Sequence, residues 1–196
     1  MASNQADVIY SPATVWVSPL GTAHPDENLA YGADWSGWTS VGWTSAALTL
    51  ELSVDKSPKT VEQVPGSIGK IITSRELTLE TTMAELTLTN LSKSWGGDVV
   101  TVAQGAGQPG YESLEITDNF CVSLMQWGFE GRFIDADCTT PLPIRFVCVG
   151  DAESGGALEF ARETQTGIPL RIEASYEQSG GGYRLGTWLK VTSEAL

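Results

Sequence analysis

Residues 48–55 of this 196-residue chain alternate strictly between apolar and polar side chains. The apolar members are Leu48, Leu50, Leu52 and Val54, and the polar members are Thr49, Glu51, Ser53 and Asp55. A period of two is the period of an extended strand with one buried face and one face in water. The pattern returns in residues 71–81 and 170–177. It predicts sheets whose two faces differ in polarity, which is typical of antiparallel β-structure.

Further candidate strands are separated by clusters of glycine and proline, of which the chain has 21 and 9. Such clusters favour turns between short strands. The candidates are residues 13–17, 98–103, 117–126, 142–149, 157–163, 168–176 and 187–191. We therefore predict a mainly β fold, an antiparallel β-sandwich or barrel. A single domain is expected over residues 1–196, with residues 1–12 as an N-terminal arm.

One helix is predicted at residues 82–95. Thr82 and Glu85 have the spacing of a capping box, in which each side chain satisfies a backbone amide at the start of the helix. An apolar stripe follows at helical spacing and consists of Ala84, Leu88, Leu91 and Trp95. Gly96 and Gly97 supply the left-handed stop at the end of the helix.

Residues 56–70 separate the first two alternating segments and hold two prolines, two glycines, three lysines and one glutamate. This composition predicts a long loop, so that the two strands form a hairpin with an extended connection. Lys56 is the first basic residue of the chain, and the loop is therefore a positive segment on an acidic protein.

The chain is strongly acidic, with a formal net charge of −13 at pH 7 and a pI near 4.3. Such a surface repels phosphates, so tight binding to nucleic acid or membranes is not expected. No apolar run approaches the roughly 18 residues of a spanning helix, and residues 1–10 lack the features of a classical export signal. Cys121, Cys138 and Cys148 have no CxxC spacing and are interpreted as small core residues in a reducing compartment.

No motif for catalysis, a cofactor or a metal stands out, and we predict that the chain is not an enzyme. Residues 105–110 satisfy GxGxxG, but no helical pattern follows, so they are interpreted as a glycine-rich turn. His24, the single histidine, is interpreted as an exposed loop residue. Two acidic pairs offer fewer oxygens than the about six to eight that calcium needs and are interpreted as solvated turns. They are Asp135 with Asp137, and Asp151 with Glu153.

Trp35, Trp38 and Trp43 lie close together in a segment rich in glycine and serine. A flat platform of these rings would stack on sugars and make the chain a carbohydrate-binding module. A buried aromatic corner is the preferred interpretation, because tryptophan buries a large apolar area. Glycoside hydrolysis, which needs two carboxylates at a set separation, is neither supported nor excluded by an acid-rich chain.

The order of features up to residue 97 resembles a known family. A strand is followed by P-x-G-T-A-x-P at residues 19–25 and by a tryptophan-glycine segment at residues 35–43. An amphipathic strand, a long polar loop, a returning strand and a capped helix complete the order. In these features the chain resembles the major tail tube proteins of bacteriophages with long, non-contractile tails, particularly those of actinobacterial phages. Some relatives append an immunoglobulin-like carboxyl domain, which is not expected here.

The resemblance implies a structural virion protein without a cofactor. Six copies would close into a ring with one continuous β-barrel, and stacked rings would form the tube through which DNA leaves the capsid for the host cell without specific binding. It also implies contacts with the tape measure protein and with tail terminator and tip proteins, assembly in the host cytoplasm, and no membrane partner. A head decoration or tail completion protein is one alternative, and a carbohydrate-binding β-sandwich is another.

The polar faces of the alternating strands would line the bore of such a ring. The residues expected there are Glu51, Asp55, Glu76, Glu80, Arg171, Glu173 and Glu177. The bore is therefore predicted to be net acidic. The 56–70 loop is expected to contact the next ring through Lys56, Lys59, Glu62, Gln63 and Lys70.

Overall fold

The computed structural model describes residues 13–61, 64–116, 123–134, 141–153, 157–158 and 167–192. Most of these residues lie in antiparallel strands, which confirms the predicted mainly β class. The described strands are β1 (Thr14–Ser18), β2 (Thr39–Ser40), β3 (Thr49–Val61), β4 (Val64–Met83), β5 (Asp98–Val102), β6 (Tyr111–Glu115), β7 (Met125–Ile134), β8 (Pro141–Glu153), β9 (Ile168–Ser175), β10 (Glu177–Ser179), β11 (Gly182–Arg184) and β12 (Thr187–Lys190). The helix α1 spans Leu88–Trp95.

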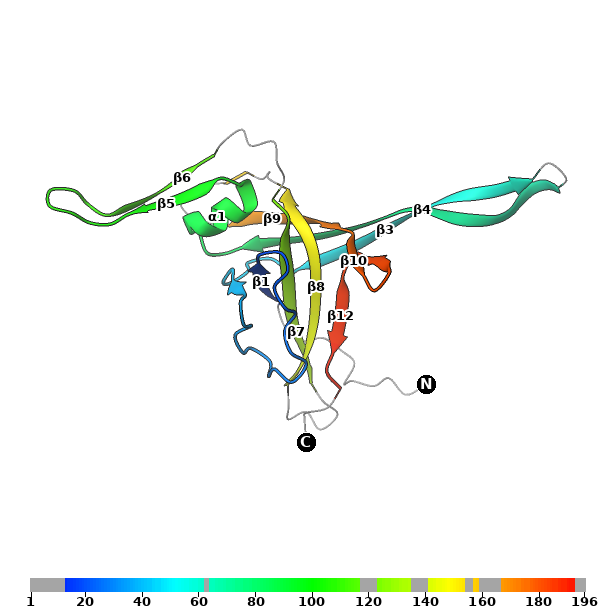
Figure 1. Cartoon of the computed structure of the whole chain (residues 1–196), viewed down its shortest axis with the longest axis horizontal. Coiled ribbons are helices and arrows are strands. Elements are labelled where there is room, and N and C mark those ends of the chain that lie inside the picture. The colour runs from blue at the N-terminus through cyan, green and yellow to red at the C-terminus, as the bar shows by residue number, and fades with distance from the viewer. Residues whose placement is uncertain are drawn as a thin grey trace.

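Eight strands form one sheet in the order β2-β1-β7-β8-β9-β4-β3, and β12 also pairs with β8. Strand β8 joins two parts of this sheet, because residues 144–147 pair with β12 and residues 149–153 pair with β9. In Figure 1, β1, β7, β8 and β12 run down the body, whereas β3, β4 and β9 cross its top. Among the described residues, the sheet ends at β2 and β3 and does not close into a barrel.

The core packs the apolar face of the crossing strands against β1, β7 and β8. Leu79 on β4 lies directly opposite Ile172 on β9, and both side chains are buried. The alternation predicted for these strands is confirmed, since the side chains between them, such as Glu80 and Glu173, are exposed. Further core members are Val15, Val17, Leu77, Met83, Trp127, Phe129, Phe146, Cys148, Ile168 and Leu170.

The helix begins later than the sequence predicts. Thr82 is still part of β4 and lies opposite Pro169 of β9, so the predicted start at residue 82 is wrong. The N-terminal cap is Thr87, whose hydroxyl accepts a hydrogen bond from the Asn90 amide at 3.1 Å. Pairing with β9 keeps Thr82 in a strand, although its spacing from Glu85 favours the start of a helix. The predicted stop is confirmed, because Gly96 has a φ of 78° and ends the helix.

The predicted loop at residues 56–70 is also wrong. Strands β3 and β4 remain paired from Lys56 opposite Ile72 out to Val61 opposite Val64. Proline and glycine favour loops, but Pro58 is tolerated because β3 is an edge strand, and the ladder accommodates the glycines through shifts in register. The result is a long ribbon of two strands that projects from the body (Figure 1).

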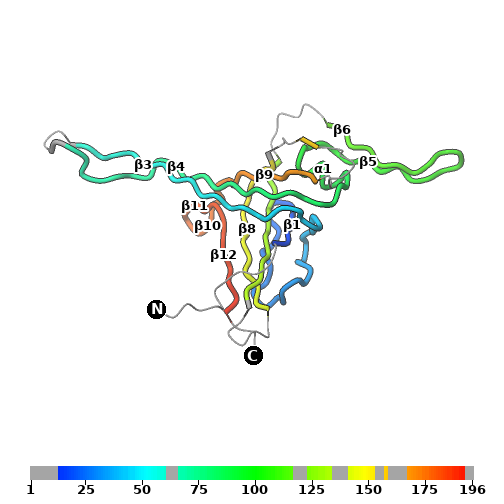
Figure 2. Tube along the Cα trace, turned by 180° about the vertical axis from the view of Figure 1, so that it is seen from behind, coloured from blue at the N-terminus to red at the C-terminus, as the bar shows by residue number. Residues whose placement is uncertain are grey.

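A second ribbon consists of β5 and β6, which form a two-stranded sheet of their own. Figures 1 and 2 show it projecting from the body in the direction opposite to the β3–β4 ribbon. The sequence predicted β5 but not β6. Strands were also predicted at residues 142–149, 168–176 and 187–191, and β8, β9 and β12 confirm them.

Several predictions fall wholly or mostly outside the described residues. They concern the N-terminal arm at residues 1–12 and most of the strands at 117–126 and 157–163. The same holds for Glu62 and Gln63 of the predicted inter-ring loop.

Candidate assembly surfaces

One face of the crossing strands gathers acidic side chains. Residues directly opposite each other in an antiparallel ladder share a face of the sheet. Glu51 of β3 lies opposite Thr78 of β4, which in turn lies opposite Glu173 of β9. Glu173 then lies opposite Asp151 of β8. This row shows that one face of the sheet continues across four strands, and we call that face the acidic face. Its described carboxylates are Glu51, Asp55, Glu76, Glu80, Asp151 and Glu173.

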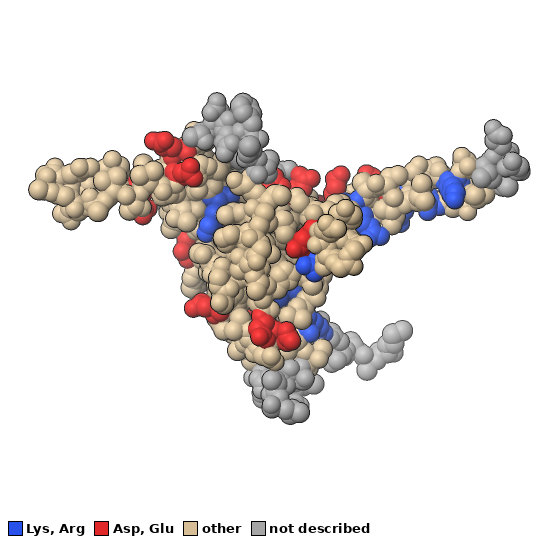
Figure 3. All heavy atoms as spheres, in the orientation of Figure 1, with Lys and Arg blue, Asp and Glu red and all other residues tan. Residues whose placement is uncertain are grey.

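Six of the seven residues predicted for the bore lie on this face. Arg171 is the basic one, and it pairs with Glu80 at 3.2 Å. Arg75 lies on the other face, opposite Val54, as the sequence parity predicts. Among the side chains that the structure describes, this face therefore carries six carboxylates and one guanidinium, and its net charge is negative. Figure 3 shows Asp and Glu side chains along the top of the crossing strands.

Glu177 does not share the acidic face. Strand β9 ends at Ser175, and Glu177 begins the separate β10–β11 hairpin, where it pairs with Arg184 at 2.9 Å. The predicted alternation therefore extends two residues too far. Conversely, Asp151 was predicted to lie in an acidic turn, but it belongs to β8 and completes the row beside Glu173.

The distal part of the β3–β4 ribbon, residues 56–72, is basic, and we call it the basic arm. Lys56, Lys59 and Lys70 are all exposed on it. Lys and Arg side chains follow one another along this ribbon in Figure 3. Ile71 and Ile72 are also exposed, at 55% and 48%. The arm therefore offers positive charge, which favours a negatively charged partner, and exposed apolar area, which a partner could cover.

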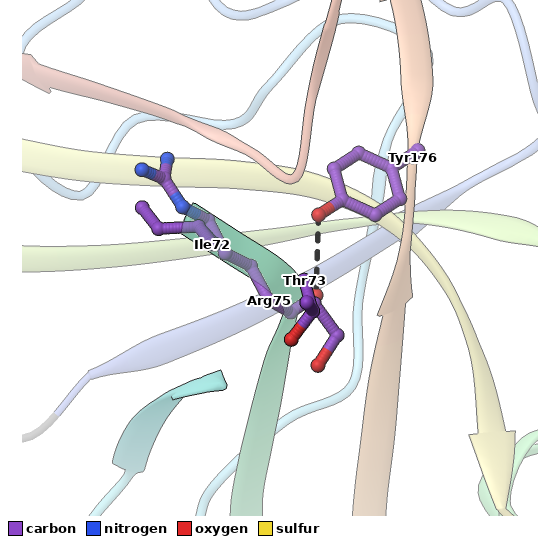
Figure 4. Close-up of a pocket in the computed structure, with 5 residues that line it drawn as sticks. Ile72, Thr73, Arg75 and Tyr176 are labelled. Atoms are coloured by element: carbon purple, nitrogen blue, oxygen red, sulfur yellow. Dashed lines mark hydrogen bonds between the residues drawn. The ribbon is translucent and has the colours of Figure 1, made fainter. Parts of the chain in front are cut away.

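A shallow hollow lies at the root of the basic arm (Figure 4). The register of β3 and β4 shifts here, between Asp55 opposite Ser74 and Lys56 opposite Ile72. The Tyr176 hydroxyl donates a hydrogen bond to the Arg75 carbonyl at 3.2 Å across the hollow. This contact ties the end of β9 to the place where the arm leaves the body.

The tryptophan cluster is a buried corner and not a sugar platform. Trp16 and Trp35 stack with 5.5 Å between their ring centroids, and Trp38 meets Trp35 edge-on at 5.3 Å. Trp35 and Trp38 are only 2% and 7% exposed, so neither offers a flat face to a sugar. Trp43 is 80% exposed and lies outside the buried cluster.

Arg145 of β8 holds the loop that carries this corner. Its Nε donates to a carboxylate oxygen of Glu130 on β7 at 2.9 Å, and both side chains are buried. The guanidinium also donates to the carbonyls of Asp26, at 2.9 Å, and Leu29. The Gly32 amide donates to the other oxygen of Glu130 at 3.0 Å. These hydrogen bonds fix the loop between β1 and β2 against the sheet.

Two predictions about isolated motifs are confirmed. Residues 105–110 form the turn of the β5–β6 ribbon, where Gly107 has a φ of 78°, so GxGxxG here is a glycine-rich turn. His24 is exposed in the loop after β1. Desolvation of its ring, and then the Arg184 guanidinium, lower the pKa of His24.

Cys148 is a core residue, as predicted, and burial raises the pKa of its thiol to about 12. Asp135, Asp137, Cys121 and Cys138 lie outside the described residues. Within the described ranges, no three His, Cys, Asp or Glu side chains gather where they could hold a metal ion. In the same part of the chain, no helix has the length and apolar character needed to cross a membrane.

Fold and surface together define a mainly β protein whose distinctive exposed features are a polar sheet face and two projecting ribbons. The chain belongs to the phage tail tube protein family, because the model of that family matches residues 1–195. No curated protein sequence matches the chain. It is accordingly a structural protein of the virion tail, and its family supports self-assembly into a tube.

Proposed function

We propose that six copies of this chain close into a ring whose bore is lined by the acidic face, and that stacked rings conduct DNA from the capsid to the host cell. The observation that carries this proposal is the acidic face itself. It is a polar surface across four strands, backed by the apolar core and bounded at one side by the edge strand β3. Unpaired backbone groups along such an edge favour pairing with another chain, and ring closure pairs every edge.

The charge of the bore follows from the chemistry of DNA. A basic wall would bind phosphates by releasing their counterions and would retain the duplex. A wall with net negative charge keeps the duplex away from the protein, so DNA passes without specific binding. The role proposed here is structural and includes no catalysed reaction.

The experiment reverses charge on the acidic face. In phage carrying Glu51→Lys with Glu173→Lys, we expect slower DNA ejection from particles that still assemble. The matched control is Glu27→Lys with Asp34→Lys, which changes the net charge equally on an exposed loop after β1. Ejection at the wild-type rate from the first variant would contradict the proposed lining of the bore.

The basic arm is proposed to contact the next ring. Deletion of residues 58–69 removes most of the arm and none of the described core residues. We expect a folded subunit that no longer polymerises, measured by circular dichroism and negative-stain electron microscopy. Tubes of normal length from this deletion would refute the role of the arm. The tape measure protein and the terminator and tip proteins are the further proposed partners, and assembly is proposed to occur in the host cytoplasm.

A further inference from the structure

The β5–β6 ribbon is acidic, and we call it the acidic ribbon. It contains Asp98, Glu112 and Glu115 and no lysine or arginine. Asp98 lies directly opposite Glu115, so two like charges face each other across the ladder. Such a pair destabilises a ribbon in isolation. A positively charged partner would relieve this repulsion.

The same face of the acidic ribbon also exposes apolar area. On β5, Val100 lies on the same side of the strand as Asp98, and on β6, Tyr111 lies on the same side as Glu115. Val100 is 49% exposed and Tyr111 is 50% exposed. A ribbon of two strands is only marginally stable in water by itself. Contact with another surface would bury these side chains and support the ribbon.

The basic arm presents a similar combination with the opposite charge, although its two lysines lie diagonally across the ladder and not directly opposite each other. Lys56 lies opposite Ile72, and Pro58 lies opposite Lys70, so the two lysines and the isoleucine share one face. Ile72 is 48% exposed, close to the values for Val100 and Tyr111. Each ribbon therefore offers two like charges beside exposed apolar side chains, and the charges on the two ribbons are of opposite sign.

The two ribbons of one copy cannot meet, because they project from the body in opposite directions (Figures 1 and 2). Their complementarity is available only between copies. A contact between two different surfaces of identical chains is heterologous, and it repeats without limit unless a rotation closes it. This is the kind of contact that stacking needs.

We propose that the acidic ribbon of one copy is the docking surface for the basic arm of a second copy in the neighbouring ring. The inference rests on the proposed function, in which the arm contacts the next ring, and it names the surface that receives the arm. Lys56 and Lys70 face Asp98 and Glu115, and the exposed apolar side chains of the two ribbons pack together.

The test reverses each ribbon separately. One variant carries Lys56→Glu with Lys70→Glu, so both of its ribbons are acidic. The other carries Asp98→Lys with Glu115→Lys, so both of its ribbons are basic. All four side chains are exposed, and we expect thermal unfolding curves close to that of the wild type. We expect neither variant to form tubes alone.

Mixing restores complementarity, because the arm of each variant then meets an oppositely charged ribbon on the other. We expect an equimolar mixture to form tubes, and a chain with all four reversals to form them alone. In wild-type tubes, a carbodiimide should join Lys56 or Lys70 of one copy to Asp98 or Glu115 of another, as identified by mass spectrometry.

The outcomes separate this inference from the function on which it rests. Tubes from the reversed acidic ribbon alone would overturn the docking surface while the proposed tube stands. Failure of both the mixture and the fourfold reversal, with each variant folded, would overturn it as well. Absence of tubes from the wild-type chain would overturn the proposed function together with the inference.

Discussion

The ion pair between Arg145 and Glu130 gives the sharpest prediction about stability. Arg145→Met keeps an unbranched side chain but removes the guanidinium. It leaves the Glu130 carboxylate, which is fully buried, with only the Gly32 amide as a hydrogen-bond donor among the contacts described above. The Leu29 carbonyl loses its guanidinium donor as well, whereas the Asp26 carbonyl keeps the hydrogen bond from the Leu29 amide. Breaking a buried pair by removing one partner costs about 3–5 kcal/mol. We therefore expect the free energy of unfolding to fall by about 4 kcal/mol.

The assay is urea unfolding followed by tryptophan fluorescence, which reports on the aromatic corner beside Arg145. With a slope of about 2 kcal/mol per molar urea, the midpoint should fall by about 2 M. The control is Arg171→Met, since the ion pair of Arg171 with Glu80 is 52% and 56% exposed and such pairs contribute about 0–1 kcal/mol. A loss of stability in Arg145→Met no larger than that of the control would show that the buried ion pair does not hold the fold together.

Three further predictions concern single residues. In Gly128→Ala the new methyl group would overlap the ring of Trp35, so we expect the free energy of unfolding to fall by about 1–3 kcal/mol. The control is Gly69→Ala, whose methyl group meets no neighbouring atom and should cost far less. Equal urea midpoints for the two variants would contradict this prediction. The thiol of Cys148, with its pKa raised to about 12, should resist iodoacetamide at pH 8 until the chain unfolds, and labelling of the folded chain, located by peptide mapping, would disprove it. Thr87→Ala removes the helix cap and should cost about 1 kcal/mol in urea unfolding, while no change would show that the cap is dispensable.

The sequence predicts those parts of the fold whose signal is local. In residues 77–83 and 168–175, burial alternates with the same period as the strand, so the pattern identifies both the strand and its faces. In residues 48–55 the alternation of burial is broken at Leu52, which is 58% exposed. The alternation of side chains along each strand alone places six of the residues predicted for the bore on the acidic face. It fails at Glu177, because the end of β9 at Ser175 is set by the hairpin that follows and not by alternation.

The remaining differences come from pairing between distant segments. Thr82 and Glu85 have the pattern of a helix cap, yet the ladder with β9 keeps residue 82 in a strand. Pro58 suggests a loop because proline has no backbone N–H to donate. An edge strand tolerates proline where that N–H would point to the open side, since no neighbouring strand needs it there. Strand β6 of the acidic ribbon is missed because its residues do not alternate, and its extended form depends on pairing with β5.

Electron cryo-microscopy of tubes assembled from the purified protein would show directly whether the acidic face lines a bore made by copies of this chain. We expect a reconstruction in which Glu51, Glu76 and Glu173 point into the bore and the basic arm reaches the neighbouring ring. A tube in which these carboxylates lie on the outer surface, or are buried between subunits, would contradict this expectation.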